Sequence, residues 1–193
     1  MFAGLALVAV AVEAAVGYPE PLYRAIGHPV TWIGRLIAWA DDAWNSPTAS
    51  FEQRRGMGVL LLFVLLGASI AMGVFVADLL EDIFDDLFAT LFCGLLASSL
   101  LAQRSLAAHV EDVASGLDEH GLAGGRGMVS RIVGRDTETL DEAGICRAAI
   151  ESLAENFSDG VVAPLFWMVV AGLPGALAYK AVNTADSMIG HKS

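Results

Sequence analysis

The sequence predicts an all-α, polytopic integral membrane protein with about four membrane segments in a single membrane domain, 1–193. Of its 193 residues, 55% are hydrophobic and the mean hydropathy is +0.59, which is more apolar than an ordinary soluble domain. The run 57–77 (MGVLLLFVLLGASIAMGVFVA) contains no charged residue. A helix of about 20 such residues crosses the hydrocarbon core of a bilayer. Three further apolar runs, at 1–18, 84–102 and 161–182, complete the pattern.

The first and last runs need separate arguments. Residues 1–18 are apolar apart from Glu13, and no positive residue precedes Arg24, which favours a retained helix over a cleaved signal peptide. A carboxylate at bilayer depth is costly and tends to be functional; the alternative places Glu13 near the interface. The run 161–182 is either a kinked span or a re-entrant hairpin. It is interrupted at Pro164, Gly172, Pro174 and Gly175.

Positive charge predicts the orientation. The loops 19–56 and 103–160 carry four and five arginines, whereas 78–86 (DLLEDIFDD) carries five carboxylates and no positive residue. The positive-inside rule therefore makes both long loops cytoplasmic, in an inner-membrane protein, and turns 78–86 outward as a solvated turn. A cation site in this acidic turn is the weaker alternative. The net charge of −11 comes without the basic stripe that nucleic-acid binding requires.

Shorter patterns predict helices within the loops and the third span. Pro29 suits the first turn of an interfacial helix, with Trp32, Ile33, Leu36, Ile37 and Trp39 on one face. Gly94, Ala97, Ser98 and Ser99 form a small-residue face for close helix packing. In the second loop we expect a helix that ends near Gly116, glycines in a loop at 124–128, a short helix at 128–133, and a capping box formed by Thr139 and Glu142.

Charge recurs every four residues after residue 146. Arg147, Glu151, Glu155 and Asp159 form one stripe if the helix continues, with Arg147 and Glu151 as a favourable pair. The expected buried face consists of Cys146, Ala149, Ile150, Leu153 and Phe157. Glu151, Glu155, Asn156 and Asp159 offer the hard oxygen ligands that Mg²⁺ prefers. Spacing alone favours the simpler interpretation, a solvated helix face. Both cysteines, Cys93 and Cys146, are interpreted as small buried hydrophobic residues.

Several polar residues lie outside this stripe. Arg131 and Arg135, beside Asp136, have a spacing that suits either a phosphate clamp or a structural ion-pair group. His28 precedes a proline, where a hydrogen bond at the start of a helix is the favoured interpretation. Lys180 lies just inside the end of the broken apolar run, and Asn183 and Asp186 directly follow it. Such a broken run is a place where backbone can line a cavity. The spacing of the other histidines, His109, His120 and His191, does not indicate a metal site.

Three stretches together resemble one family, the adenosylcobinamide-phosphate synthases of cobalamin biosynthesis (CobD/CbiB type), which are integral membrane proteins. They are GHPVTWIGRLI (27–37), VGRDTETLDEAGICRAAIESLAENFSDGVVAPLFW (133–167) and GLPGALAYKAVNTADSMIGH (172–191). The resemblance implies ATP- and Mg²⁺-dependent amide formation between adenosylcobyric acid and (R)-1-aminopropan-2-ol phosphate. The implied partners are these corrinoid and amino-alcohol phosphate substrates, the lipid bilayer and a membrane complex of cobalamin-pathway enzymes. The alternatives are a small membrane transporter and a non-catalytic membrane scaffold.

The chemistry of that reaction assigns expected roles to the residues above. The catalytic candidates are Glu151, Glu155, Asp159 and Asp186, with Glu151 and Glu155 also as metal ligands. The substrate-binding candidates are His28, Arg131, Arg135, Asp136, Asn156, Lys180 and Asn183. Two features differ from the family pattern: Glu13 stands at a different spacing from the family's aspartate, and members of the family continue beyond the position of Ser193.

Overall fold

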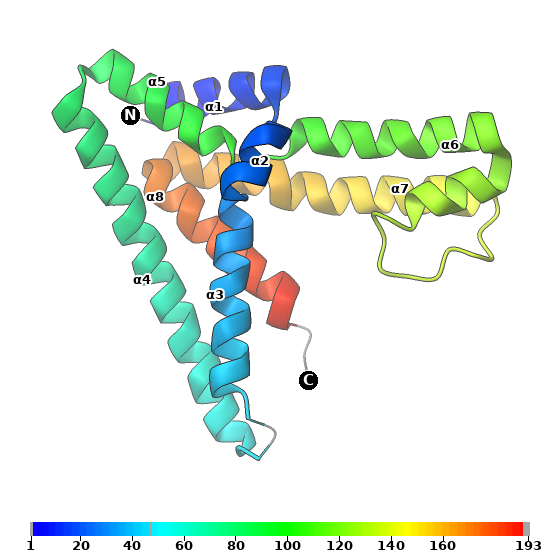
Figure 1. The fold of residues 1–193 in the computed structure, drawn as a ribbon, viewed down its shortest axis with the longest axis horizontal. Helices are drawn as coiled ribbons and strands as arrows, with labels where there is room; N and C mark the ends of the chain where they lie inside the picture. The colour runs from blue at the N-terminus through cyan, green and yellow to red at the C-terminus, as the bar shows by residue number, and fades with distance from the viewer. Residues whose placement is uncertain (1, 47, 191–193) are drawn as a thin grey trace. The chain divides into compact units, whose positions relative to one another are not determined.

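The structure is a computed structural model that describes residues 2–46 and 48–190. Throughout those residues the regular structure is helical and contains no strand (Figure 1), which confirms the predicted all-α class. The chain separates into two compact units, which are described in turn: unit 1 comprises residues 1–101 and 163–193, and unit 2 comprises residues 102–162.

Unit 1 contains the long apolar helices. They are α1 (Ala3–Val16), α2 (Glu20–Ile26), α3 (Pro29–Trp44), α4 (Phe51–Ile83), α5 (Asp86–Ser98), α8 (Ala163–Ala185) and the π-helical turn η2 (Asp186–Gly190). Three helical runs are long and apolar enough to cross a membrane, namely Phe51–Ile83, Asp86–Val129 and Glu142–Gly190. A fourth span results if α1 and the segment Glu20–Trp44, which bend by 106° at their junction, count as one. The prediction of about four membrane segments is confirmed.

The reversal between α4 and α5 is tighter than the sequence suggested. Helix α4 continues through most of the acidic stretch to Ile83, and α5 begins at Asp86. The predicted turn at 78–86 is therefore wrong in extent, since only Phe84 and Asp85 lie between the helices. The Asp85 carboxylate accepts hydrogen bonds from the backbone N–H groups of Leu87 and Phe88, both at 3.1 Å. This N-cap satisfies free donors at the start of α5 and stops α4 from propagating into it.

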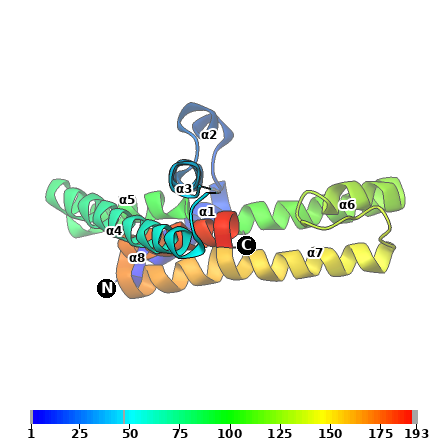
Figure 2. The same ribbon diagram turned by 90° about the horizontal axis from the view of Figure 1, so that it is seen from below.

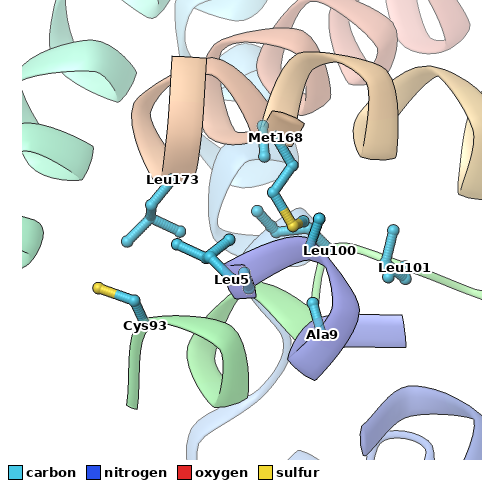
Figure 3. Close-up of a cluster of buried hydrophobic side chains, with 10 residues drawn as sticks. Leu5, Ala9, Cys93, Leu100, Leu101, Met168 and Leu173 are labelled. Carbon is cyan, nitrogen blue, oxygen red and sulfur yellow. The ribbon is translucent and has the colours of Figure 1, made fainter. Parts of the chain in front are cut away.

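The largest buried cluster of unit 1 joins α1, α5 and α8. Figure 3 shows Leu5 and Ala9 of α1 facing Leu100, Met168 and Leu173. A Cβ atom at Gly94 would lie 2.6 Å from the side chain of Val8, so α1 approaches α5 over a position that only glycine allows. This close approach agrees with the predicted small-residue face. Cys93 is buried as predicted, whereas Cys146 is exposed and that part of the prediction is wrong.

Helices α4 and α8 also meet at a glycine. A Cβ atom at Gly73 would lie 2.5 Å from Cα of Pro174. Helix α8 is broken just before this contact, at Ala171 and Gly172, where Gly172 has φ 65°, a conformation that glycine adopts without strain. The interruption predicted within 161–182 is thus a break inside one helical run.

Helix α3 divides the face that the sequence assigned to it. Ile37 is fully buried against α4 and α8 in a cluster with Leu61 and Ala181. The indole of Trp39 and the side chain of Leu36 are exposed, at 58% and 39%. The expectation of one shared face is therefore wrong, because the apolar stripe is wide enough to pack on one side and to leave a second apolar side uncovered.

Unit 2 consists of α6 (Gln103–Val129), α7 (Glu142–Phe157) and the π-helical turn η1 (Ser158–Val162). Figures 1 and 2 both show α6 and α7 side by side. Helix α6 does not end near Gly116: it continues to Gly121, where φ is 60°, and then resumes. The second part folds back on the first, so that Gly124 lies against the backbone of Gly116. The glycines expected in a loop are therefore helical, and Gly124 and Gly125 allow a close approach, whereas a Cβ atom at Gly127 would meet nothing within 4 Å.

Helix α7 starts and packs differently from the expectation. Its N-cap is Asp141, whose carboxylate accepts the Gly144 N–H at 2.7 Å, so the predicted Thr139–Glu142 capping box is wrong. The residues that bury this helix are Gly144, Ile145, Ala148, Ala149 and Ser152. Of the predicted buried face, Ala149 is buried, Leu153 is half-buried, and Cys146, Ile150 and Phe157 are exposed. The predicted helix at 128–133 is also wrong, since α6 ends at Val129.

Candidate functional site

Unit 2 contains a cavity of about 410 Å³ between α6, the chain after α6, and α7. This volume falls in the range of small-molecule sites, about 300–1,000 Å³. Its apolar wall includes Leu106, Val133 and Leu153. Its polar lining residues are Ser105, His109, Arg131, Ser152 and Asn156.

Hydrogen bonds fix the floor of this cavity. The buried Ser152 hydroxyl donates to the Ile132 carbonyl at 2.6 Å, which ties the chain after α6 to α7. The Asn156 amide donates to the Ser152 carbonyl at 2.8 Å and to its Oγ at 3.2 Å. Two of the predicted substrate-binding residues, Arg131 and Asn156, thus reach one cavity.

The two predicted phosphate-binding arginines have different environments. The Arg135 guanidinium forms an ion pair with the Glu151 carboxylate, whereas Arg131 lines the cavity. The pair Arg147–Glu151 expected from spacing is not formed, because Arg147 lies 4.0 Å from Asp141 instead. Both members of the Arg135–Glu151 pair are more than half exposed. Such a pair contributes about 0–1 kcal/mol to stability, so its charges remain accessible to a polar ligand.

The chain between α6 and α7 is held by side chains rather than by regular structure. The Arg126 guanidinium donates to the Leu140 carbonyl at 2.8 Å, and the buried Thr137 hydroxyl donates to the Arg126 carbonyl at 3.3 Å. Asp136 accepts the Glu138 N–H at 2.9 Å, which is a local turn of the type that aspartate favours. Asp136 therefore has a structural partner, and it is not among the residues that line the cavity.

The carboxylates of α7 do not form one continuous stripe. Glu151 and Glu155 lie on α7 and are exposed, whereas Asp159 lies in the π-helical turn η1. A π-helical turn changes the spacing from four residues to five, so Asp159 departs from the line of the other two. Among the described residues, three or more His, Cys, Asp or Glu side chains do not gather anywhere into a group that could hold a metal ion.

The remaining predicted site residues lie in unit 1. His28 is the N-cap of α3: its Nδ1 accepts the Val30 N–H at 3.2 Å, and Thr31 completes a capping box. The favoured interpretation of His28 as a hydrogen-bonding residue at the start of a helix is confirmed. The turn is further fixed by Tyr18, whose hydroxyl donates to the Gly27 carbonyl at 2.7 Å and whose ring lies 4.4 Å from the imidazole.

The cap requires a neutral imidazole at His28, because Nδ1 accepts a hydrogen bond from the Val30 N–H. Lys180, another predicted substrate-binding residue of unit 1, is half-buried in α8.

The third motif bends at the end of α8. The Thr184 hydroxyl donates to the Lys180 carbonyl at 2.7 Å, and the Ser187 hydroxyl donates to the Asn183 carbonyl at 3.0 Å. Asn183 is half-buried in α8, and Asp186 is exposed at the first position of η2. The last residue of this motif, His191, lies outside the described residues.

Comparison with known proteins covers almost the whole chain. The family described as CobD/Cbib protein matches residues 6–193. The chain belongs to the CobD/Cbib family. Curated relatives named "Cobalamin biosynthesis protein CobD" come from Rhizobium meliloti (strain 1021), which is 51% identical over 97% of this chain, and from Rhodobacter capsulatus, which is 47% identical over 100%.

These CobD relatives are longer than the present chain, which spans 57% of the Rhizobium meliloti protein and 59% of the Rhodobacter capsulatus protein. No solved structure matches the chain. The CobD/Cbib assignment agrees with the family resemblance of the three motifs. Two of them contribute to the features above, since His28 starts α3 and the central motif supplies one wall of the unit 2 cavity.

Sequence reasoning missed three polar residues of this cavity. Ser105 and His109 line it from α6, and Ser152 lines it from α7. The sequence spacing of His109 indicates no metal site, and it gives no other role to this residue. The available signal was the four-residue interval from Ser105 to His109, which places both on one helical face. No pattern among neighbouring residues of the sequence indicates that this face of α6 lies opposite Arg131.

Proposed function

We propose that this chain takes part in cobalamin biosynthesis as the membrane part of an adenosylcobinamide-phosphate synthase. The proposed reaction is ATP-dependent formation of an amide bond between adenosylcobyric acid and (R)-1-aminopropan-2-ol phosphate. The observation that carries the proposal is the cavity of unit 2, which is lined by the Arg131 guanidinium, the His109 imidazole and the Asn156 amide. Its α7 wall, with Ser152, Leu153 and Asn156, belongs to the central family motif.

The chemistry of the lining residues supports a phosphate-bearing substrate. Arg131 presents a planar guanidinium, which suits bidentate contact with phosphate. His109 and Asn156 supply neutral or positive donors beside it. We propose that the amino-alcohol phosphate binds here, with Arg135 and Asp136 at the margin.

The proposed carboxylate roles need a phosphoryl-transfer step. A carboxylic acid forms an amide readily once it is activated, most simply as an acyl phosphate, and ATP with Mg²⁺ supplies that activation. In this proposal Glu151 and Glu155 bind Mg²⁺. Asp159 in unit 2 and Asp186 in unit 1 are further catalytic candidates. Carboxylates of this type hold Mg²⁺ together with substrate phosphates, so the protein itself does not need a three-carboxylate cage.

The proposed setting is the inner membrane with the loops 19–56 and 103–160 in the cytoplasm. His28, Lys180 and Asn183 would then belong to a second group of polar residues at the membrane boundary, available to the large corrinoid. A membrane complex with other enzymes of the pathway is part of the same proposal.

The test is a product assay in membranes that contain the protein, supplied with adenosylcobyric acid, the amino-alcohol phosphate, ATP and Mg²⁺. We expect amide product, a loss of at least about 100-fold in kcat for Glu151→Gln, and a raised KM for the amino-alcohol phosphate in Arg131→Gln. Glu111→Gln, an exposed carboxylate change on α6, is the matched control and keeps full activity. Unchanged turnover in Glu151→Gln refutes the carboxylate role, and absence of product from the unmutated protein favours a transporter or a scaffold.

A further inference from the structure

A second cavity, of about 470 Å³, lies in unit 1 where the end of α3, the start of α4 and the turn η2 meet. Its lining has two parts. Arg54 and Arg55 form the charged part, and an aromatic and aliphatic wall includes Trp44, Phe51 and Leu61. The proposed reaction uses none of these residues.

The two guanidinium groups are available to an anion. Both side chains are exposed, and neither forms an ion pair with a carboxylate of the described chain. The cavity also contains one acidic residue, the half-buried Asp41, which accepts a hydrogen bond from the Asn45 amide at 2.9 Å. Two fixed positive charges against one negative charge leave a net attraction for an anionic group, and adjacent guanidinium groups suit phosphate oxygens.

The position of the cavity along α4 indicates the depth of its ligand. Arg54 and Arg55 directly precede the uncharged run 57–77, which is the strongest membrane-spanning run of the chain. The arginines therefore lie at headgroup level, and Trp44 is the residue type that favours this level. Only 17% of the apolar window of α4 is buried, and Phe63 is 67% exposed, so an acyl chain can continue from the cavity along α4.

These observations fit an amphiphile better than a soluble anion. A free phosphate needs the arginines but has no use for the apolar wall, whereas a phospholipid uses both. Basic pockets between helix ends on one side of a membrane are suited to anionic headgroups. We propose that this cavity binds one anionic glycerophospholipid, with its phosphate on Arg54 and Arg55 and an acyl chain beside Leu61.

The binding test uses native mass spectrometry of the purified protein with equal amounts of phosphatidylglycerol and phosphatidylcholine. We expect one retained phosphatidylglycerol, bound at least about tenfold more tightly than phosphatidylcholine. The variant Arg54→Gln/Arg55→Gln loses this preference. The control Arg24→Gln/Arg35→Gln removes the same charge from exposed positions outside the cavity and keeps it.

A second variant separates loss of binding from loss of folding. Gly58 lines the cavity, and a Cβ atom there meets nothing within 4 Å. We therefore expect Gly58→Leu to occupy the cavity and remove the lipid while helix content stays unchanged. Equal retention of both lipids by the unmutated protein, or phosphatidylglycerol retention in both cavity variants, overturns the proposal. Inorganic phosphate at about 10 mM, a concentration on the order of the dissociation constant of a weak anion site, is then added. Displacement of the lipid identifies a soluble phosphate as the ligand, and that result also overturns the proposal.

Discussion

The contact between α4 and α8 predicts that one methyl group added at Gly73 lowers the free energy of unfolding. A Cβ atom at Gly73 would lie 2.5 Å from Cα and 2.7 Å from the backbone nitrogen of Pro174, whereas carbon atoms in contact prefer about 3.5–4.0 Å. In Gly73→Ala the two helices therefore separate by about 1 Å, since a backbone atom of a proline cannot rotate away. Such overpacking costs about 1–3 kcal/mol.

Gly67→Ala is the matched control in the same helix. Gly67 is exposed and a Cβ atom there meets nothing within 4 Å. Replacing glycine by alanine inside a helix gains about 0.8–1.0 kcal/mol at either position. Because that gain is common to both variants, the difference in their free energies of unfolding isolates the overpacking cost at Gly73.

The measurement is reversible unfolding in mixed detergent micelles, followed by far-UV circular dichroism. We expect Gly67→Ala to unfold at a higher denaturant fraction than the unmutated protein, and Gly73→Ala to be about 1–3 kcal/mol less stable than Gly67→Ala. Equal stability of the two variants would contradict the close approach of α4 and α8 at Pro174.

Two further predictions concern local structure. Gly121→Ala lowers the free energy of unfolding by about 1–2 kcal/mol because φ is 60° at this position, although a Cβ atom there would meet no atom within 4 Å. Gly127→Ala in the same helix is the control, and we expect it to be neutral or stabilising when both variants are unfolded by heat. Ser152→Ala removes the donor to the Ile132 carbonyl and costs about 1–3 kcal/mol, seen as faster amide exchange of the chain after α6.

Features that depend on local chemistry could be predicted from the sequence. The uncharged run 57–77 is part of α4, Pro29 is the first residue of α3, and the proline and glycine residues of 161–182 mark the break in α8. Each follows from a rule that concerns neighbours in the chain: span length, the φ of proline, or the conformational freedom of glycine. The small-residue face around Gly94 belongs with them, because close helix approach requires such a face whatever the partner is.

Features that depend on a distant contact could not be predicted. The sequence of α7 fits several buried faces. The observed face includes Ser152, whose hydroxyl donates to the Ile132 carbonyl, 20 residues earlier in the chain. The partner of Glu151 is Arg135, on a segment without regular structure, rather than Arg147 one turn away. Helical spacing indicates which residues of one helix can pair with each other. It does not indicate whether a residue from a distant loop pairs with one of them instead.

The two most specific motifs share a deviation from α-helical geometry. The first contains η1 at Ser158–Val162 and the second contains η2 at Asp186–Gly190, and each π-helical turn carries an acidic residue, Asp159 and Asp186. π-Helical turns are rare overall, but those that occur are frequently found at functional sites. They shift backbone groups and side chains away from the regular α-helical spacing. Glu151 is paired with Arg135, whereas Glu155 forms no ion pair with the described residues. In the proposed chemistry Glu151, held in place by Arg135, and Glu155 are therefore the metal ligands, and each π-helical turn supplies one further candidate carboxylate.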